Sequence, residues 1–473
     1  MKVVQTDVAI IGAGTAGLSA YKAVTKSGKQ AVLIEGGPYG TTCARVGCMP
    51  SKLLIAAAEA AHIAQHGTAF GIHITGKVKV NGVEVMDRVR RERDRFVGFV
   101  LDGLENIPAE RKIRGYARFV GATSLEVDDH TRVHASRVVI ATGSSAHIPA
   151  PFKSLGDRAI TNEEVFGWTD LPSSVAVFGP GVIGLELGQA LSRLGVKVRV
   201  FGVSGSLAGL TDLKVRQTAK KVFQREFYLD PDARVLEMQR EGDEVLVRYI
   251  RLDNSECIER FDYALIATGR RPNLSTLDIA KAGIEVTQTG LPRFDRSTMQ
   301  IEALPIFIAG DVNNDVPLLH EASDEGHIAG LNAARWPDVL PGSRTTPMAI
   351  VFTDPQIAMV GMGPDKLAPG SFVVGEVDFT GQGRSRVMLK NSGVLRVYGD
   401  IASRRLMGAQ LVGPSAEHLA HLLAWSVEQS MTIDQMLQMP FYHPVVEEGL
   451  RTALRHAASE LALASDTTIP GSA

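Results

Sequence analysis

The chain has 473 residues, a formal net charge of −2 and a hydrophobic fraction of 45%. This length corresponds to roughly three or four structural units of about 100–200 residues. The near-neutral charge gives no indication of binding to nucleic acid or to an anionic membrane surface. No apolar run reaches the roughly 18 residues that span a bilayer, and the N-terminus leads directly into a strand-like run without a signal peptide. We therefore expect a cytoplasmic protein with no membrane partner.

The cysteines are few: Cys43, Cys48 and Cys257. A low, odd number in a chain of this length argues against a secreted disulfide framework. In a reducing compartment, two closely spaced cysteines are more typical of a catalytic or metal-binding pair than of a structural bond. A closed zinc site needs four ligands, and no second Cys/His cluster of suitable spacing follows the pair. We therefore expect no metal site.

Two segments share one succession of elements, which is a strand, a tight glycine turn, a helix and a second, parallel strand. The first copy places its strand, helix and second strand at residues 8–11, 18–26 and 31–34. The second copy places them at residues 175–178, 185–194 and 196–201. This repetition indicates an internal duplication of a dinucleotide-binding unit.

The turns of the two copies carry the glycines that such a unit requires. They are Gly12, Gly14 and Gly17 in the first copy and Gly179, Gly181 and Gly184 in the second. Glycines here allow a tight turn and close approach of a pyrophosphate, which the N-terminus of the helix then binds. Glu35 ends the second strand of the first copy, where a carboxylate binds ribose hydroxyls.

The second copy departs from this pattern at the ribose position. Gly202 stands where Glu35 stands in the first copy, and the loop at residues 203–208 contains no arginine. A 2′-phosphate is usually bound by a guanidinium group. The sequence therefore has neither the acid typical of NAD sites nor the cation typical of NADP sites, and the choice of nucleotide stays open.

The pattern changes along the rest of the chain. Ala-Thr-Gly follows a strand-like run twice, at residues 141–143 and 267–269, and residues 306–311 are expected to form a buried strand ending in a carboxylate. From about residue 345 the pattern is α+β, with strands at 349–353, 394–398 and 407–412 and helices at 416–429 and 445–458. The small, polar tail at residues 465–473 is expected to be poorly ordered.

These patterns predict an α/β protein with two Rossmann-like dinucleotide-binding domains and a C-terminal α+β domain. The expected domains are residues 1–150 and 151–274 for the two dinucleotide-binding domains, 275–344 for a segment that returns to the first of them, and 345–473 for the C-terminal domain.

The cysteine pair is constrained by geometry. Residues five apart in an ideal helix have Cα atoms about 8.6 Å apart, whereas a disulfide needs roughly 4.4–6.8 Å. Cys43 and Cys48 can therefore bridge only if Cys43 lies in an irregular turn before a helix, and Gly47 and Pro50 favour such a distortion. The alternative, from the two cysteines alone, is a pair of buried, unreactive thiols.

The segment from Gly40 to Lys52 resembles the active-site segment of the class I pyridine nucleotide–disulfide oxidoreductases, which include dihydrolipoamide dehydrogenase, glutathione reductase and mercuric reductase. The resemblance covers nearly the whole chain, through both glycine motifs, both Ala-Thr-Gly motifs and residues 269–273, 309–311 and 443–448. It implies FAD and NAD as cofactors, with NADP possible, a redox disulfide of Cys43 and Cys48, and a homodimer joined through the C-terminal domain.

The resemblance also assigns roles to the residues around the flavin. Cys48 is implied to be the thiol in charge-transfer contact with the flavin, and Cys43 the thiol that exchanges with substrate. Lys52 is implied to lie by the flavin, paired with Glu186.

Other matched positions are implied to contact the cofactors. Asp311 would bind the FAD ribitol, Gly115 and Ala117 would flank the adenine, and Leu318 and Ala322 would place N–H groups near the flavin pyrimidine edge. The remaining implied positions are Thr42, Thr142, Gly143, Ile183, Gly202, Gly269, Arg270 and Gly310.

His443 is the candidate general acid–base. An imidazole suits thiol–disulfide exchange because its pKa lies near neutral pH. Pro444 disfavours a helical conformation at His443 and suits the first turn of the helix that follows. Glu448 would orient the other imidazole nitrogen. The resemblance implies that this pair completes the active site of the partner subunit.

The resemblance favours a dihydrolipoamide dehydrogenase-like enzyme acting on a lipoyl domain or a small dithiol. Two departures leave alternatives open: Phe441 stands where lipoamide dehydrogenases carry another histidine, and Thr41 replaces a usual glycine. No cysteine follows Cys257, so the C-terminal redox pairs of large thioredoxin reductases and mercuric reductases are absent. The first alternative is an NAD(P)H-dependent reductase of a glutathione-like disulfide, a quinone or a metal ion. The second is a flavin-bound redox sensor without turnover.

Overall fold

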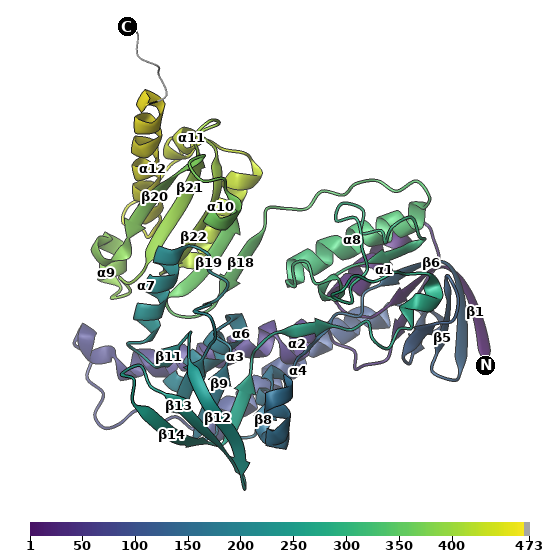
Figure 1. The fold of residues 1–473 in the computed structure, drawn as a ribbon, viewed down its shortest axis with the longest axis horizontal. Coiled ribbons are helices and arrows are strands. Elements are labelled where there is room, and N and C mark those ends of the chain that lie inside the picture. The colour runs from purple at the N-terminus through teal and green to yellow at the C-terminus, as the bar shows by residue number, and fades with distance from the viewer. Residues whose placement is uncertain (468–473) are drawn as a thin grey trace. The chain divides into compact units, whose positions relative to one another are not determined.

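The structure is a computed structural model that describes residues 1–467 (Figure 1). The chain divides into two compact units, each built from three separate stretches. Unit 1 comprises Met1–Leu53, Asp87–His147 and Gly269–Arg344, and unit 2 comprises Leu54–Met86, Ile148–Thr268 and the chain from Thr345 onward. No helix within residues 1–467 is both long enough and apolar enough to cross a membrane.

Unit 1 is built on a seven-stranded sheet with the order β3-β2-β1-β6-β5-β4, in which β17 also pairs with β6. Its parallel strands are β1 (Lys2–Ile11), β2 (Ala31–Glu35), β3 (Lys112–Arg114), β6 (Thr131–Ile140) and β17 (Ile306–Ile308). The strands β4 (Ala117–Phe119) and β5 (Ser124–Val127) add an antiparallel edge. The expected strand at residues 8–11 is the fully buried end of β1, as a parallel core strand requires.

Two helices of unit 1 pack closely together. They are α1 (Thr15–Lys26) and α8 (Leu319–Arg335). A side chain at Gly326 or Gly330 of α8 would overlap the backbone of Ala16 or Ala20 on α1. These two glycines therefore let the backbones approach, and the close packing fixes the N-terminus of α8 relative to the first glycine turn.

Unit 2 contains the second dinucleotide-binding sheet, with the order β11-β10-β9-β15-β8 and all neighbours parallel. The strands are β8 (Ala159–Ile160), β9 (Ser174–Phe178), β10 (Lys197–Phe201), β11 (Tyr228–Asp230) and β15 (Tyr263–Ile266), with helices α6 (Val182–Arg193) and α7 (Leu213–Phe223). A separate antiparallel sheet consists of β12 (Arg234–Glu241), β13 (Glu244–Ile250) and β14 (Glu256–Phe261).

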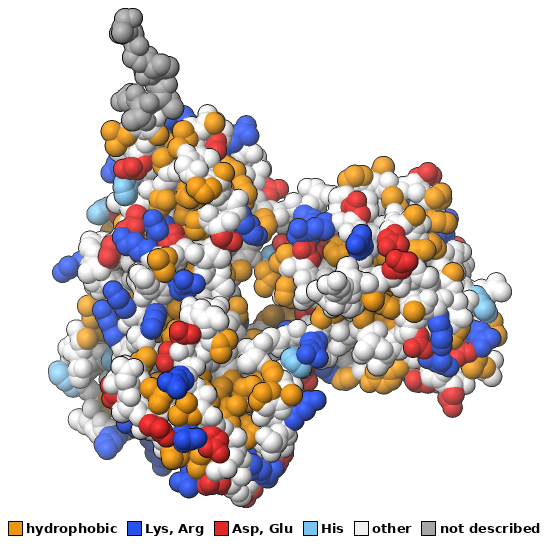
Figure 2. Space-filling view, viewed as in Figure 1, with side chains coloured by type: hydrophobic (Ala, Val, Ile, Leu, Met, Phe, Trp, Pro, Cys, Tyr) orange, Lys and Arg blue, Asp and Glu red, His pale blue; other side chains and the backbone are white. Residues whose placement is uncertain are grey.

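The C-terminal part of unit 2 is a five-stranded antiparallel sheet with helices, so the expected α+β pattern is confirmed. The sheet order is β18-β19-β22-β21-β20, formed by β18 (Met348–Val351), β19 (Gln356–Gly361), β20 (Phe372–Asp378), β21 (Val394–Asp400) and β22 (Leu406–Gly413). Helices α10 (Ala416–Glu428), α11 (Ile433–Leu437) and α12 (Glu447–Thr467) complete it. Large apolar side chains stay exposed here, including Trp425 at 63% and Tyr442 at 80%, and Figure 2 shows apolar side chains on the visible face of this part.

The last helix differs from the sequence-based expectation at both ends. It begins at Glu447 instead of residue 445, and it continues to Thr467. Residues 465–467 are therefore helical, and the expectation of a poorly ordered tail is wrong for them. The rest of that tail, residues 468–473, lies outside the described residues.

Candidate active site

The cysteine pair lies where one short helix ends and a long one begins. Cys43 is in α2 (Thr42–Val46), and Cys48 is the first residue of α3 (Cys48–Gln65). The backbone breaks between them at Gly47, with φ −127° and ψ −116°. The distortion that the sequence predicts at Gly47 is present, and Cys43 lies before it in a one-turn helix. A side chain at Gly47 would press on the backbone of Thr42 and Cys43, so glycine suits the break.

The two cysteines are free thiols that interact with each other. The expected disulfide is therefore not formed in this structure, which represents the reduced pair. The hydrogen bond with Cys48 raises the pKa of the Cys43 thiol, and burial raises it further. The raised pKa of Cys43 favours its protonated form. Cys43 then needs an external base to become a nucleophile, because the thiolate is the reactive form.

His443 and Glu448 form a pair in unit 2. The His443 Nδ1 lies 3.0 Å and 3.1 Å from the two carboxylate oxygens of Glu448, and the Val445 N–H donates to the same carboxylate at 3.3 Å. The bond with His443 lowers the pKa of Glu448, with a smaller contribution from Val445. Glu448 lies in the first turn of α12, whose dipole also favours a carboxylate there.

The imidazole is presented to solvent. The His443 side chain is 80% exposed, and its Nδ1 is held by Glu448, so Nε2 is the nitrogen that can accept a substrate proton. His443 lies four residues before α12 begins, so the expectation that it stands at the start of the helix is wrong. Because α12 begins at Glu447, its first turn supplies Glu448, the residue that orients the imidazole.

The first glycine turn fits a bound pyrophosphate. A side chain at Gly12 would overlap the carbonyl of Ala141, and one at Gly17 would overlap the carbonyl of Gly12. Gly14 has no atom within 4 Å of the place where a side chain would stand. Two glycines thus serve close packing, and the third leaves open space at the N-terminus of α1, where phosphates bind.

Glu35 holds the edge of this turn. Its carboxylate accepts hydrogen bonds from the Ala13 N–H and the Gly37 N–H, both at 2.7 Å. The Gly115 N–H donates to the Glu35 carbonyl at 3.0 Å, which places the implied adenine-flanking segment beside the same strand end. Ala117 is buried in β4. The arrangement fits the adenosine end of FAD, and the contacts of these residues with the cofactor stay predictions.

A polar cluster in unit 1 fits the ribitol end of FAD. The Ser144 Oγ donates to Asp311 at 2.8 Å, and the Arg270 Nε donates to Ser144 Oγ at 2.7 Å. The Thr142 Oγ1 donates to the Asn273 carbonyl at 2.7 Å, and the Asn273 N–H donates to Gly143. The structure thus brings together Thr142, Gly143, Arg270, Gly310 and Asp311 from three distant motifs. The sequence analysis did not name Ser144 or Asn273 as site residues, although Ser144 directly follows the motif at residues 141–143 and Asn273 ends the motif at residues 269–273.

The N-terminus of α8 corrects one expectation. The Ala322 N–H donates to the Leu318 carbonyl at 2.9 Å, and the Leu318 N–H donates to Val316 at 2.8 Å. Neither N–H group is free to bind the flavin pyrimidine. The helix begins at Leu319, so by helix geometry the unpaired N–H groups belong to residues 319–321.

A buried carboxylate that the sequence analysis missed holds this region together. The Glu325 side chain accepts from the Gly310 N–H at 2.8 Å and from the Asn313 amide at 2.7 Å. Its other oxygen lies 3.0 Å from the Arg344 guanidinium, which also pairs with Glu321. Burial raises the pKa of Glu325. Glu325 therefore ties the turn before Asp311 to α8.

The second glycine turn repeats the first. A side chain at Gly179 would overlap Ala267, and one at Gly184 would overlap Gly179, whereas Gly181 faces open space. At the ribose position, a Cβ atom on Gly202 would lie 2.6 Å from a Pro180 ring carbon. The second turn therefore fits a pyrophosphate, but a side chain at position 202 does not fit.

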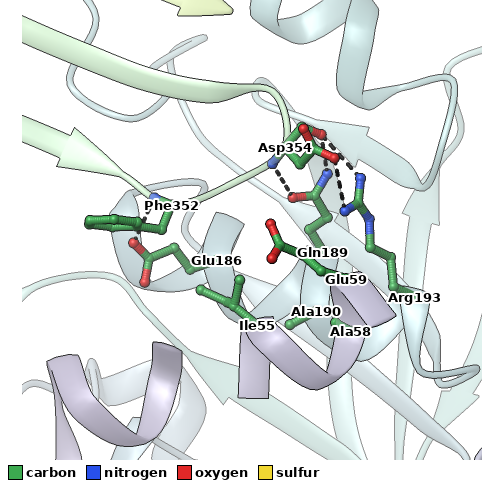
Figure 3. Close-up of a pocket in the computed structure, with 9 residues that line it drawn as sticks. All are labelled: Ile55, Ala58, Glu59, Glu186, Gln189, Ala190, Arg193, Phe352 and Asp354. Atoms are coloured by element: carbon green, nitrogen blue, oxygen red, sulfur yellow. Dashed lines mark hydrogen bonds and ion pairs between the residues drawn. The ribbon is translucent and has the colours of Figure 1, made fainter. Parts of the chain in front are cut away.

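Helix α6 also carries Glu186, which is only 4% exposed (Figure 3). Its carboxylate accepts from the Phe352 N–H at 2.9 Å. One turn further, Gln189 exchanges hydrogen bonds with the backbone of Asp354, and the Arg193 guanidinium lies 3.2 Å from the Asp354 carboxylate. These contacts fix α6 on the segment after β18. The implied pairing of Glu186 with Lys52 stays a prediction.

The sequence of this chain is similar to those of known proteins over both units. Residues 6–326 match the family model described as pyridine nucleotide-disulphide oxidoreductase, and residues 347–454 match the dimerisation domain of that family. The chain belongs to the pyridine nucleotide-disulphide oxidoreductase family. A dihydrolipoyl dehydrogenase of Halobacterium salinarum is 31% identical over 465 residues, which cover 96% of each chain. A dihydrolipoyl dehydrogenase of Chlamydia muridarum is 29% identical, with 93% of this chain and 94% of that protein covered.

A solved structure shares the fold. The HOCl-induced flavoprotein disulfide reductase RclA from Escherichia coli matches with a TM-score of 0.79 and 22% identity, covering 96% of this chain and 99% of that one. A Cu(II) complex of the same enzyme also matches with a TM-score of 0.79. The predicted family and fold class are confirmed. As a family member the chain uses FAD and NAD(P), and its dimerisation domain supports a homodimer.

Proposed function

We propose that the protein is a dihydrolipoamide dehydrogenase-like enzyme that passes electrons between a dithiol and NAD(P) through FAD and the Cys43–Cys48 pair. The observation that carries this proposal is the placement of the two thiols. Cys48 is exposed at the N-terminus of α3, which suits a negative charge, whereas Cys43 lies partly buried in α2 and suits exchange with substrate after a base removes its proton. His443, oriented by Glu448, is the base that we assign to this step.

The exchange steps follow from these groups. With the pair oxidised, the His443 Nε2 takes a proton from a substrate thiol, and the resulting thiolate attacks the Cys43 sulfur. The Cys43–Cys48 bond breaks, and Cys48 leaves as a thiolate. The second substrate thiol then attacks the mixed disulfide, which releases the Cys43 thiol and the oxidised substrate. Two electrons now reside on the pair, and FAD supplies their transfer to the nicotinamide.

The substrate class follows from the relatives, which are dihydrolipoyl dehydrogenases over nearly the whole chain. We propose a lipoyl group, either on a carrier domain or free, as the dithiol, with the homodimer in the cytoplasm as the working form. Steady-state rates with dihydrolipoamide and NAD+ or NADP+ test this directly. The proposal would be contradicted if turnover with dihydrolipoamide were slower than turnover with every other pair of electron donor and electron acceptor.

A second candidate is an NAD(P)H-dependent reductase of another acceptor, and Phe441 favours it. This residue replaces the second histidine of lipoamide dehydrogenases, and the Arg451 guanidinium lies 5.6 Å from its ring centre. RclA, the structural neighbour, was solved with Cu(II). Within residues 1–467, no cluster of three or more His, Cys, Asp or Glu side chains could hold a resident metal ion. Rates of NADH-dependent reduction of Cu(II) and of glutathione disulfide would separate the two candidates.

A further inference from the structure

The end of β10 is the place where the second dinucleotide unit would contact a ribose. Gly202 is buried there, and its N–H donates to the Asp230 carbonyl at 2.7 Å while its carbonyl accepts from Ala233 at 2.9 Å. A Cβ atom on Gly202 would lie 2.6 Å from Pro180 Cγ and 2.7 Å from the Pro231 carbonyl oxygen. Both distances are shorter than van der Waals contact permits. Position 202 therefore accepts only glycine while Pro180 keeps its place.

The first dinucleotide unit shows what Pro180 removes. Ala13 occupies the matching place in the first glycine turn, and its N–H donates to the Glu35 carboxylate at 2.7 Å. A proline has no N–H group. Pro180 therefore shares with the Pro231 carbonyl the space that an acid at position 202 would need, and it also lacks the donor that would have held that acid.

The loop after Gly202 folds back over the same turn. The Ala208 N–H donates to the Pro180 carbonyl at 2.9 Å, and the Gly205 N–H donates to Pro231 at 3.1 Å. Ser204 and Ser206 are exposed, and residues 203–208 carry no charged side chain. This loop therefore brings neutral hydroxyl and backbone groups next to the second glycine turn.

We propose that the packing of Gly202 against Pro180 and the Pro231 carbonyl keeps an acid out of the nicotinamide-nucleotide site. The ribose is then contacted by neutral groups of the loop at residues 203–206. The protein then binds NAD and NADP with dissociation constants within about tenfold of each other, because the charged hydrogen bonds that discriminate between them are missing. This proposal rests on the placement of the nucleotide at the second glycine turn.

Binding measurements test the proposal without any dithiol substrate. Calorimetry on the FAD-loaded protein gives the dissociation constants of NAD+ and NADP+. Gly202→Glu alone should weaken both nucleotides, because the side chain must displace both Pro180 and the Pro231 carbonyl. The double variant Pro180→Ala, Gly202→Glu supplies the N–H donor and the acid that Ala13 and Glu35 supply in the first unit. It should bind NAD+ more tightly than Gly202→Glu does, because only the Pro231 carbonyl still has to move, and it should weaken NADP+ by more than about tenfold relative to NAD+.

Pro180→Ala alone is the matched control, and its ratio of the two dissociation constants should equal that of the wild type. FAD content and the thermal midpoint show whether each variant keeps its fold. A Gly202→Glu variant that binds NAD+ as the wild type does and rejects NADP+ would overturn the proposal, as would a wild-type ratio above about one hundred. A failure to oxidise dihydrolipoamide would contradict the proposed function and leave these binding ratios unaffected.

Discussion

The two active-site thiols differ because of their surroundings, although they are separated by only four residues. Cys43 is partly buried and hydrogen bonded to Cys48, and both effects raise the pKa of its thiol. Cys48 is exposed at the N-terminus of α3, where the helix dipole favours negative charge. These different surroundings explain why Cys48 can rest as a thiolate and why Cys43 requires a base.

Replacing each cysteine separately should give opposite spectra. Cys48→Ser should abolish the long-wavelength absorbance of the two-electron-reduced enzyme, because that band requires a thiolate in contact with the flavin. Cys43→Ser should show the band without reduction as the pH rises, because Cys48 can no longer form a disulfide. Cys257→Ser is the control, since Cys257 is buried in unit 2 beside Glu259. Identical spectra for the two active-site variants would contradict the assignment.

His443→Gln should slow the dithiol half-reaction by about 10²–10⁴-fold, the usual contribution of a positioned acid–base group. Hydride exchange between nucleotide and flavin should keep its rate, because it needs no imidazole. Glu448→Gln should give a milder defect of the same kind, because the imidazole remains and loses only its charged partner. Stopped-flow measurement of each half-reaction separates the two effects. Equal slowing of both half-reactions would point to a structural defect instead.

At the scale of elements, the sequence predicted the features that local patterns determine. The strand, glycine turn and helix of each dinucleotide unit were predicted correctly because β-branched runs, glycines and helix periodicity all lie within one short stretch. The distortion at Gly47 was also predicted, because a glycine between the two cysteines is a local signal. The bonds of Glu325 could not be predicted, because its partners Gly310 and Arg344 are distant in the sequence. The strands β19 and β20 were not predicted, and each contains a glycine, which weakens the sequence pattern of a strand.

Glu325 connects two elements, so its loss should affect cofactor binding from a distance. Glu325→Ala would leave the Gly310 N–H and the Asn313 amide without an acceptor in a buried place, at a cost of about 1–3 kcal/mol for each group. We expect weaker FAD binding and a lower thermal midpoint. Glu325→Gln should recover much of both, because it keeps an acceptor oxygen. Fluorescence titration with FAD measures the affinity, with Glu285→Ala, an exposed position, as control.

A wild-type FAD affinity in Glu325→Ala would show that the turn before Asp311 keeps its shape without this carboxylate. The residue would then be a contributor to stability alone. Glu325→Gln distinguishes a steric role from a hydrogen-bonding role. If the side chain acts only through its size, Glu325→Gln should equal the wild type in both FAD affinity and thermal midpoint.

At the scale of the whole molecule, two observations concern the C-terminal part of the chain. Its residues 347–454 match the dimerisation domain of the family, and it exposes Trp425, Met439 and Tyr442. These side chains line or border an apolar groove that also contains Phe441, two residues before His443. Exposed apolar surface of this kind is typical of a protein interface. We therefore expect His443 to lie close to the subunit boundary.

Mixed dimers test whether each active site is shared between subunits. One subunit carries His443→Gln and the other carries Cys48→Ser. If a site draws its cysteines from one chain and its histidine from the other, one site has both wild-type groups and the second has neither. Such a dimer should show about half of the wild-type rate, although each variant homodimer is nearly inactive. Differently tagged subunits purified in two affinity steps provide the mixed species. A rate near zero would place His443 in the same chain as the cysteines it serves, because then each site would contain one defect.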